Sequence, residues 1–349
     1  MSILTGSSKE SWHPVMTSDT TTASYWLNWR VLVCAIWLLL SMIFAVFLIR
    51  KYEGFCKRRI GEIQQEEPGA LYEDETWRPC LKGIHPAWLL AFRVVAFLVL
   101  LILLTVTAFA DGGGIFYFYT QWTFVLVTIY FGLGSVLSMH GCYQYHRKAG
   151  GDRVDNVDAD TELGTWVATA PAPGESSKTS NPNPSKSSGP HEQGQPRKPA
   201  GIWGYIFQII FQMNGGAVML TDCVFWLIIV PFLAIKDYNL NFLVINMHTI
   251  NAVFLLGETA LNCLRFPWFR MGYFCLWTVI YVSFQWIVHA CINLWWPYPF
   301  LDLSSPFAPL WYFSVALMHI PCYGIFALIM KLKHHVLSTK YAESYQCMR

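Results

Sequence analysis

The sequence predicts an all-α fold, a polytopic bundle of about seven transmembrane helices with its N-terminus outside and its C-terminus in the cytosol. Three observations predict it. The 349-residue chain is 54% hydrophobic and only 13% charged, whereas soluble domains carry about a quarter charged residues. Seven apolar stretches are long enough to cross roughly 30 Å of hydrocarbon as helices. The basic residues fall almost entirely in alternate connections between these stretches, as the positive-inside rule requires.

Each predicted span is an apolar run of about 20 residues, which is the length that a helix needs to cross a bilayer. In chain order the spans are Val31–Ile49, Pro86–Ala110, Ile115–Met139, Gly215–Ile235, Leu240–Asn262, Met271–Cys291 and Phe307–Met330. The first span is followed rather than preceded by basic residues, so it is predicted to be an anchor and not a cleaved signal. The second and third are joined by residues 111–114 only, which predicts a tight helical hairpin.

The placement of Lys and Arg sets the predicted orientation. Of the 24 such residues, only Lys9, Arg30 and Lys236 lie on the outer side and Arg93 lies inside a span. The others lie on the predicted inner side. This pattern predicts a multi-pass protein of the plasma membrane or the endoplasmic reticulum. With six spans instead of seven, the basic connections would no longer fall on the same side of the membrane.

The predicted organisation has five parts. They are an outer tail (1–30), spans one to three (31–139) with a cytosolic loop (50–85), a cytosolic loop (140–200), spans four to seven (201–331) and a cytosolic tail (332–349). The loop 140–200 is rich in Ser, Pro, Asn and Gly, so it cannot bury enough apolar surface to offset chain entropy and is predicted to be disordered. Ile202–Met213 is too short to span and is expected either to lie in the interface or to extend the fourth helix.

Composition and motifs exclude several function classes. No strongly basic patch of the kind that binds nucleic acid is present. The ten cysteines include no C-x-x-C pair and no zinc-ligand spacing, so we predict no metal site and no cofactor, and we expect free thiols on the cytosolic side. Membrane lipids are the predicted partners, and the sequence makes no prediction of oligomeric state.

Ionisable and polar groups inside a span are costly, which makes each one a candidate functional residue. At about 1.5 Å of rise per residue, Thr120, His248 and His289 fall at one depth in the outer half of the predicted bundle. A threonine beside a histidine is the minimum needed for acyl transfer, because the imidazole can remove the hydroxyl proton and later return it to the leaving group. The alternative is that these groups only bond the backbone or neighbouring helices.

A second set of ionisable residues is predicted near the inner face. Arg93, Asp222 and Glu258 lie on spans two, four and five at similar depth, which predicts a buried ion cluster. The cluster could be a structural tie between helices, a proton or ion path, or a support for an active site. Ten residues separate His248 from Glu258, about 15 Å along one helix, so Glu258 is not expected to orient His248.

Three local sequences resemble a known family. Phe118–Gly132 (FYTQWTFVLVTIYFG), Asn246–Glu258 (NMHTINAVFLLGE) and Trp286–Asp302 (WIVHACINLWWPYPFLD) are similar to the rolling stone group of membrane proteins and to the wider androgen-induced family, which includes integral-membrane lipid hydrolases. The resemblance covers spans two to seven and leaves the first helix and the disordered loop outside.

The resemblance implies roles for named residues. In the hydrolase branch a membrane-embedded threonine is the nucleophile, a histidine in an M-H-T motif is its partner, and the substrates are fatty-acid esters of hydroxy fatty acids. These roles correspond to Thr120 and His248, with Thr123 as the alternative if the register differs. His289 matches a further histidine position, although the second histidine of the paired motif is Ala290 here.

Two functions from different classes remain open on the sequence. The first is a membrane-embedded threonine hydrolase of fatty-acid esters whose substrate enters from the outer leaflet. The second is a non-enzymatic membrane protein for adhesion, fusion, scaffolding or trafficking, in which residues 152–199 would be the working part. A transporter or a receptor is less well supported, because no inverted repeat and no N-P-x-x-Y motif occur.

Overall fold

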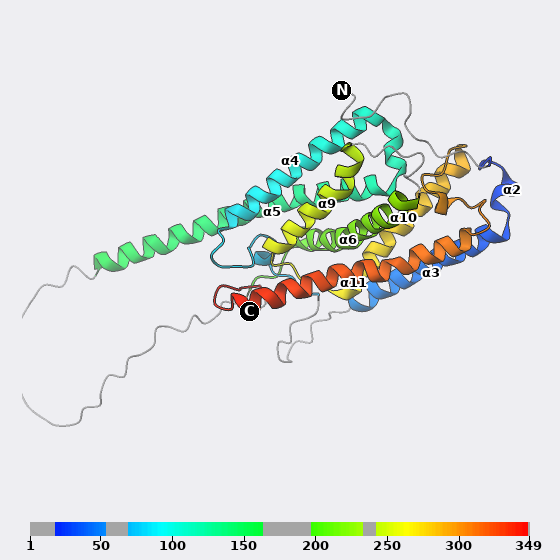
Figure 1. Ribbon diagram of the computed structural model, residues 1–349. Helices are drawn as coiled ribbons and strands as arrows, with labels where there is room; N and C mark the ends of the chain where they lie inside the picture. The colour runs from blue at the N-terminus through cyan, green and yellow to red at the C-terminus, as the bar shows by residue number, and fades with distance from the viewer. Residues whose placement is uncertain (1–17, 54–68, 163–196, 233–241, 348–349) are drawn as a thin grey trace, which may run out of the picture.

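The computed structural model describes residues 18–53, 69–162, 197–232 and 242–347, and it confirms an all-helical fold. Outside the helices it contains three isolated β-bridges. The long helices form an elongated bundle (Figure 1). They are α3 (Trp29–Tyr52), α4 (Pro86–Asp111), α5 (Tyr119–Glu162), α6 (Ile202–Val224), α9 (Phe242–Leu261), α10 (Met271–Cys291) and α11 (Ala308–Lys340). The short ones are α2 (Ala23–Trp26), the 3-10 turns Glu73–Thr76, Gly113–Tyr117, Trp268–Arg270 and Pro299–Leu301, the π-helix Phe225–Ile229 and α7 (Val230–Phe232).

The long helices alternate in direction, so their ends gather at two opposite faces of the bundle. At one face the backbone amide of Cys80, before α4, donates to Leu261 at the end of α9. Likewise the amide of Lys82 donates to the carbonyl of Ser344, just beyond α11. The start of α4 therefore meets the ends of α9 and α11. We call this the inner face, after its predicted side.

At the opposite face, called the outer face below, the chain before α3 meets the loop between α10 and α11. The hydroxyl of Tyr25 in α2 donates to Asp302 (3.0 Å). The guanidinium of Arg30, at the start of α3, donates to the carbonyl of Ser304 (2.7 Å). These contacts close the outer end of the bundle and place α3 beside α10 and α11.

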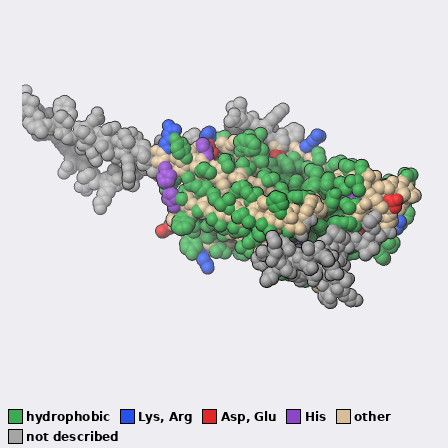
Figure 2. All heavy atoms as spheres, turned by 90° about the horizontal axis from the view of Figure 1, so that it is seen from above, with side chains coloured by type: hydrophobic (Ala, Val, Ile, Leu, Met, Phe, Trp, Pro, Cys, Tyr) green, Lys and Arg blue, Asp and Glu red, His purple; other side chains and the backbone are tan. Residues whose placement is uncertain are grey.

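Six helical segments of the described chain are long and apolar enough to cross a membrane. They are Trp29–Tyr52, Pro86–Ala110, Tyr119–Arg147, Ile202–Ile229, Trp268–Cys291 and Ala308–Lys340. Large apolar side chains are exposed along them, including Leu39, Ile102 and Leu328, and hydrophobic atoms dominate the face drawn in Figure 2. An apolar exterior is what a lipid-facing surface requires. The chain is thus a multi-pass membrane protein.

The remaining predicted span, Leu240–Asn262, corresponds to α9, which is a helix of 20 residues. The side chains of its first residues lie outside the described part of the chain. The count of seven crossings and the N-out orientation stay predictions.

The fourth predicted span, Gly215–Ile235, was placed too late in the chain. The helix begins at Ile202 and continues through Asn214, Gly215 and Gly216 without a break, so Ile202–Met213 extends it. The two glycines are needed for close packing: a Cβ on Gly216 would lie 2.4 Å from a ring atom of Phe274. The polar and glycine-rich stretch is buried in the middle of the bundle, where α6 contacts α5, α9, α10 and α11.

Two further boundaries differ from the prediction. After a left-handed Gly112 (φ 75°) and a short 3-10 turn, α5 begins at Tyr119 and not near residue 115. It then extends past Met139 to Glu162, so the first part of the predicted disordered loop is helical (Figure 1). Residues 163–196 lie outside the described chain.

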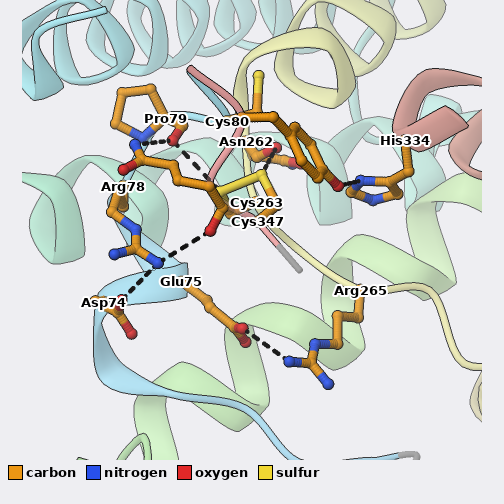
Figure 3. Close-up of a disulfide and its surroundings, with 12 residues drawn as sticks. Asp74, Glu75, Arg78, Pro79, Cys80, Asn262, Cys263, Arg265, His334 and Cys347 are labelled. Carbon is orange, nitrogen blue, oxygen red and sulfur yellow. Dashed lines mark hydrogen bonds and ion pairs between the residues drawn. A yellow bond between two sulfur atoms is a disulfide. The ribbon is translucent and has the colours of Figure 1, made fainter. Parts of the chain in front are cut away.

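The inner face carries a disulfide between Cys263, just after α9, and Cys347 near the C-terminus (Figure 3). The expectation of free thiols is wrong for this pair. The C-terminal tail folds back across the end of α9 and brings together two cysteines that are 84 positions apart, a contact that spacing alone does not reveal. Cys80 packs beside them as a free thiol, and burial raises the pKa of that thiol.

Candidate functional site

Thr120 and His248 line the same cavity in the outer half of the bundle. The cavity and its open mouth together hold about 530 Å³ of empty space. Its wall is mostly apolar and comes from α5, α6, α9, α10, α11 and the Pro299–Leu301 turn. The polar side chains on this wall are those of Tyr119, Thr120, Thr221, His248, Thr278, Tyr281 and Tyr298.

Thr120 lies in the first turn of α5, where helical amides have no partner within the helix. Its hydroxyl is 3.4 Å from that of Tyr298, and the backbone amides of Tyr119 and Thr120 also contact the Tyr298 hydroxyl. The start of α5 therefore brings together one nucleophilic hydroxyl, one phenolic donor and two amides. A helix N-terminus favours negative charge, so this corner of the cavity suits a developing oxyanion.

Thr123, the alternative nucleophile, is one turn further along α5. Its hydroxyl donates to the backbone carbonyl of Tyr119 (3.1 Å) and it is fully buried. Thr123 does not contribute to the cavity wall. The two threonines thus differ in environment, and Thr120 alone of the pair lines the cavity.

His248 is held in place from two directions by α6 and its π-helical extension. Its ring stacks on Phe225, with the centroids 3.7 Å apart and the planes 5° from parallel. Its Nδ1 is 3.6 Å from Oδ1 of Asp222, a separation that allows charge attraction but exceeds hydrogen-bond length. Because Nδ1 faces the carboxylate, Nε2 is the ring nitrogen left for chemistry. The π-helix begins at Phe225, three residues after Asp222, and such segments occur frequently at functional sites.

Asp222 does not belong to the inner ion cluster in which the sequence placed it. Counting from the predicted helix start at Gly215 put it near the inner face. Counting from Ile202 puts it 20 residues along, about 30 Å from the inner end of α6. The pairing of Asp222 with His248 was therefore not predicted, because the start of α6 was placed too late in the chain.

The other two members of that cluster do pair. Arg93 of α4 and Glu258 of α9 are fully buried, with Nη2 and Oε1 2.6 Å apart. Tyr130 donates to the same carboxylate oxygen (2.9 Å), and Arg93 also donates to the carbonyl of Thr76 (2.7 Å). Both charges are thus compensated by several partners, and the pair ties α4, α5 and α9 together at the inner end of the bundle.

His289 is buried near the outer end of α10, but it does not contribute to the cavity wall. Its ring stacks on Trp296 at 3.7 Å. Its Nδ1 is 2.7 Å from the carbonyl of Gln285 and its Nε2 is 3.3 Å from that of Trp295. With both nitrogens at backbone carbonyls, His289 fastens the outer loop to α10. The structure therefore groups Thr120 with His248 and leaves His289 apart from them.

A third buried histidine, His319 of α11, was missed because it lies within a long apolar run. Its Nδ1 is 2.8 Å from the carbonyl of Val315, so Nδ1 carries the proton and Nε2 accepts. The hydroxyl of Thr278 lies 2.8 Å from this Nε2, and Tyr119 lies 2.9 Å from Thr278. A hydrogen-bonded chain thus links α5, α10 and α11 beside the cavity. Tyr298, whose hydroxyl lies beside that of Thr120, was not among the candidate residues either.

A hydroxyl, an imidazole with a carboxylate behind it, and nearby donors form the set needed for nucleophilic acyl transfer. Within the described residues no group of three or more His, Cys, Asp or Glu side chains could hold a metal ion. No protein-family model matches the chain, and comparisons with curated proteins and with solved structures find no match. The resemblance to the rolling stone and androgen-induced families stays a prediction from the sequence.

Proposed function

We propose that this protein is an integral-membrane hydrolase of fatty-acid esters in which Thr120 is the nucleophile and His248 the general base. One observation carries the proposal: Thr120 and His248, on different helices, line one apolar cavity, and Asp222 stands behind His248. The depth of the two residues along their predicted spans and the family resemblance of the sequence around them both point to this pair. A cavity inside an apolar helix bundle suits a substrate with a hydrocarbon part.

The reaction would proceed in two halves. In the first, His248 Nε2 takes the proton of the Thr120 hydroxyl as its oxygen attacks the ester carbonyl. The tetrahedral intermediate collapses, the alcohol leaves with the proton returned by His248, and an acyl-threonine ester forms. In the second half, His248 deprotonates a water molecule that attacks this ester. The fatty acid leaves and the proton returns to Thr120, so the balance is ester plus water to acid plus alcohol.

The neighbouring groups have supporting roles in this scheme. Asp222 is a positioning residue, because its carboxylate favours the orientation with Nε2 toward the cavity and stabilises the imidazolium that forms. Tyr298 would donate its hydroxyl to the oxyanion, a kind of contact that is worth about 3–4 kcal/mol per donor in enzymes, and the amides at the start of α5 would hold the Tyr298 oxygen in place. Since the cavity wall is mostly apolar, these contacts act in a medium of low dielectric constant.

The test is ester turnover by purified protein in lipid nanodiscs, with a 4-nitrophenyl fatty ester as the reporter. Thr120→Ala and His248→Ala should reduce turnover to the background of empty nanodiscs, while Thr120→Ser retains a measurable rate.

Thr123→Ala is the matched control, because it removes a buried threonine hydroxyl three residues away that does not reach the cavity. It should keep most of the wild-type turnover. Wild-type turnover in Thr120→Ala, or equal losses in Thr120→Ala and Thr123→Ala, would contradict the proposal.

A further inference from the structure

A second cavity adjoins the first on the side of α3. Together with its open mouth it also holds about 530 Å³ of empty space, and it is formed by α3, α10, α11 and the Pro299–Leu301 turn. The two cavities share five wall residues, which lie at their junction: Thr278, Val282, Phe300, Leu301 and Val315. We call the second cavity the α3 slot.

The α3 slot runs along the helix axes. On α11 it extends from Trp311 to His319, eight residues or about 12 Å at 1.5 Å per residue. Its outer end is the Pro299–Leu301 turn, and its inner end lies between Cys275 of α10 and His319. A space of this length, parallel to helices in an apolar bundle, suits a linear molecule.

Four polar side chains of the slot wall have partners within the protein. Ser41 bonds the backbone of its own helix (2.9 Å), and Tyr312 donates to the carbonyl of Leu301 (3.1 Å). Thr278 and His319 bond each other (2.8 Å). Since these groups are already paired, a ligand gains little by offering polar atoms to them. The rest of the wall is apolar and aromatic, so the ligand should be hydrocarbon.

We propose that the α3 slot binds one unbranched acyl chain of the ester that reacts at Thr120. The inference rests on the proposed function for the identity of the reacting group, but the slot itself is argued from its shape and wall. The shared residues would let a chain pass from the reaction cavity into the slot. Its wall includes Trp37 and Leu38 of α3, so α3 would help to set the preferred chain length.

Binding is tested without catalysis, in the Thr120→Ala protein in phosphatidylcholine nanodiscs, with a hexadecanoic acid that carries a photoreactive diazirine near its methyl end. Cross-links should map by mass spectrometry to the wall residues of α3, α10 and α11. Ala316→Trp fills the slot and should reduce these cross-links by at least about tenfold, since each methylene excluded costs about 0.8 kcal/mol.

Leu317→Trp is the matched control, because Leu317 is the next residue on α11 but is 52% exposed on the outside of the bundle. It should leave the cross-links unchanged. Equal labelling in the Ala316→Trp and Leu317→Trp proteins, or cross-links confined to outward-facing positions, would overturn the inference.

A second readout uses turnover in the presence of an intact Thr120. Trp37→Ala enlarges the slot from α3 and should shift the preference toward longer or bulkier acyl chains, measured as the ratio of hexadecanoyl-ester to butanoyl-ester turnover relative to wild type. An unchanged chain-length profile would contradict the role of α3. If esters of every length fail to turn over but the photoreactive acid still labels the slot, the proposed function fails while the acyl site stands.

Discussion

Replacing Asp222 by Asn tests the arrangement around His248 most sharply, because the change keeps the shape of the side chain and removes its charge. The carboxylate lies 3.6 Å from Nδ1 of His248, and the two side chains are 18% and 7% exposed. At an effective dielectric constant of about 20, opposite unit charges at this separation attract by about 5 kcal/mol. Part of this is lost to residual solvent, so we expect about 3–4 kcal/mol less stabilisation of the imidazolium in the transition state.

This loss corresponds to about a hundred- to a thousandfold decrease in kcat, at 1.4 kcal/mol for each factor of ten. The assay is turnover of a 4-nitrophenyl fatty ester in nanodiscs, with kcat and KM measured separately. KM should change little, since Asp222 contacts the histidine and does not line the cavity. Asp222→Glu should recover part of the rate, because the charge is restored.

Asp302→Asn is the control for removing a carboxylate elsewhere, since Asp302 bonds Tyr25 and Ser304 in the outer loop. Its effect on kcat per folded protein should be small. A wild-type kcat in Asp222→Asn, or a loss confined to KM, would refute the positioning role of Asp222.

Three further predictions concern stability. Arg93→Leu leaves the Glu258 charge buried and should destabilise the protein by about 3–5 kcal/mol, whereas Arg93→Leu combined with Glu258→Leu should recover much of the loss in thermal unfolding in detergent. Gly216→Val forces apart α6 and Phe274 of α10 and should lower Tm more than Gly324→Ala, whose added Cβ meets no atom within 4 Å. Cys347→Ser opens a long covalent loop and should cost about 2–5 kcal/mol. Unaltered unfolding temperatures would contradict each of these. Disulfides are typical of oxidising compartments, whereas the charges predict a cytosolic inner face. The orientation is therefore also tested by labelling Cys263 and Cys347 with a membrane-impermeant maleimide in sealed cells or vesicles, before and after reduction.

The sequence predicted the helices well because apolar runs are a strong and local signal. It misplaced the start of α6, because Gln208, Gln212 and Asn214 resemble an interfacial segment when their surroundings are unknown. Both glutamines in fact donate to the carbonyl of Arg265 inside the bundle. Because of that single error, Asp222 was predicted near the inner end of the helix, away from His248.

The site shows the same division between local and long-range information. Depth along a helix brought Thr120 and His248 to the same level, and that estimate needed only the residue count. The roles of Tyr298, Thr278 and His319 depend on which helices are neighbours, which one chain does not reveal. The bond between Cys263 and Cys347 likewise depends on the return path of the C-terminal tail.

The most direct measurement of the central claim is covalent labelling of the protein in native membranes with a lipophilic fluorophosphonate, followed by mapping of the modified residue. An activated threonine hydroxyl should attack the probe as it would an ester. We predict that the label is found on Thr120, that it is lost in Thr120→Ala and His248→Ala, and that Thr123→Ala retains it. Labelling that persists undiminished in Thr120→Ala, or that maps to a residue outside the cavity, would contradict the account.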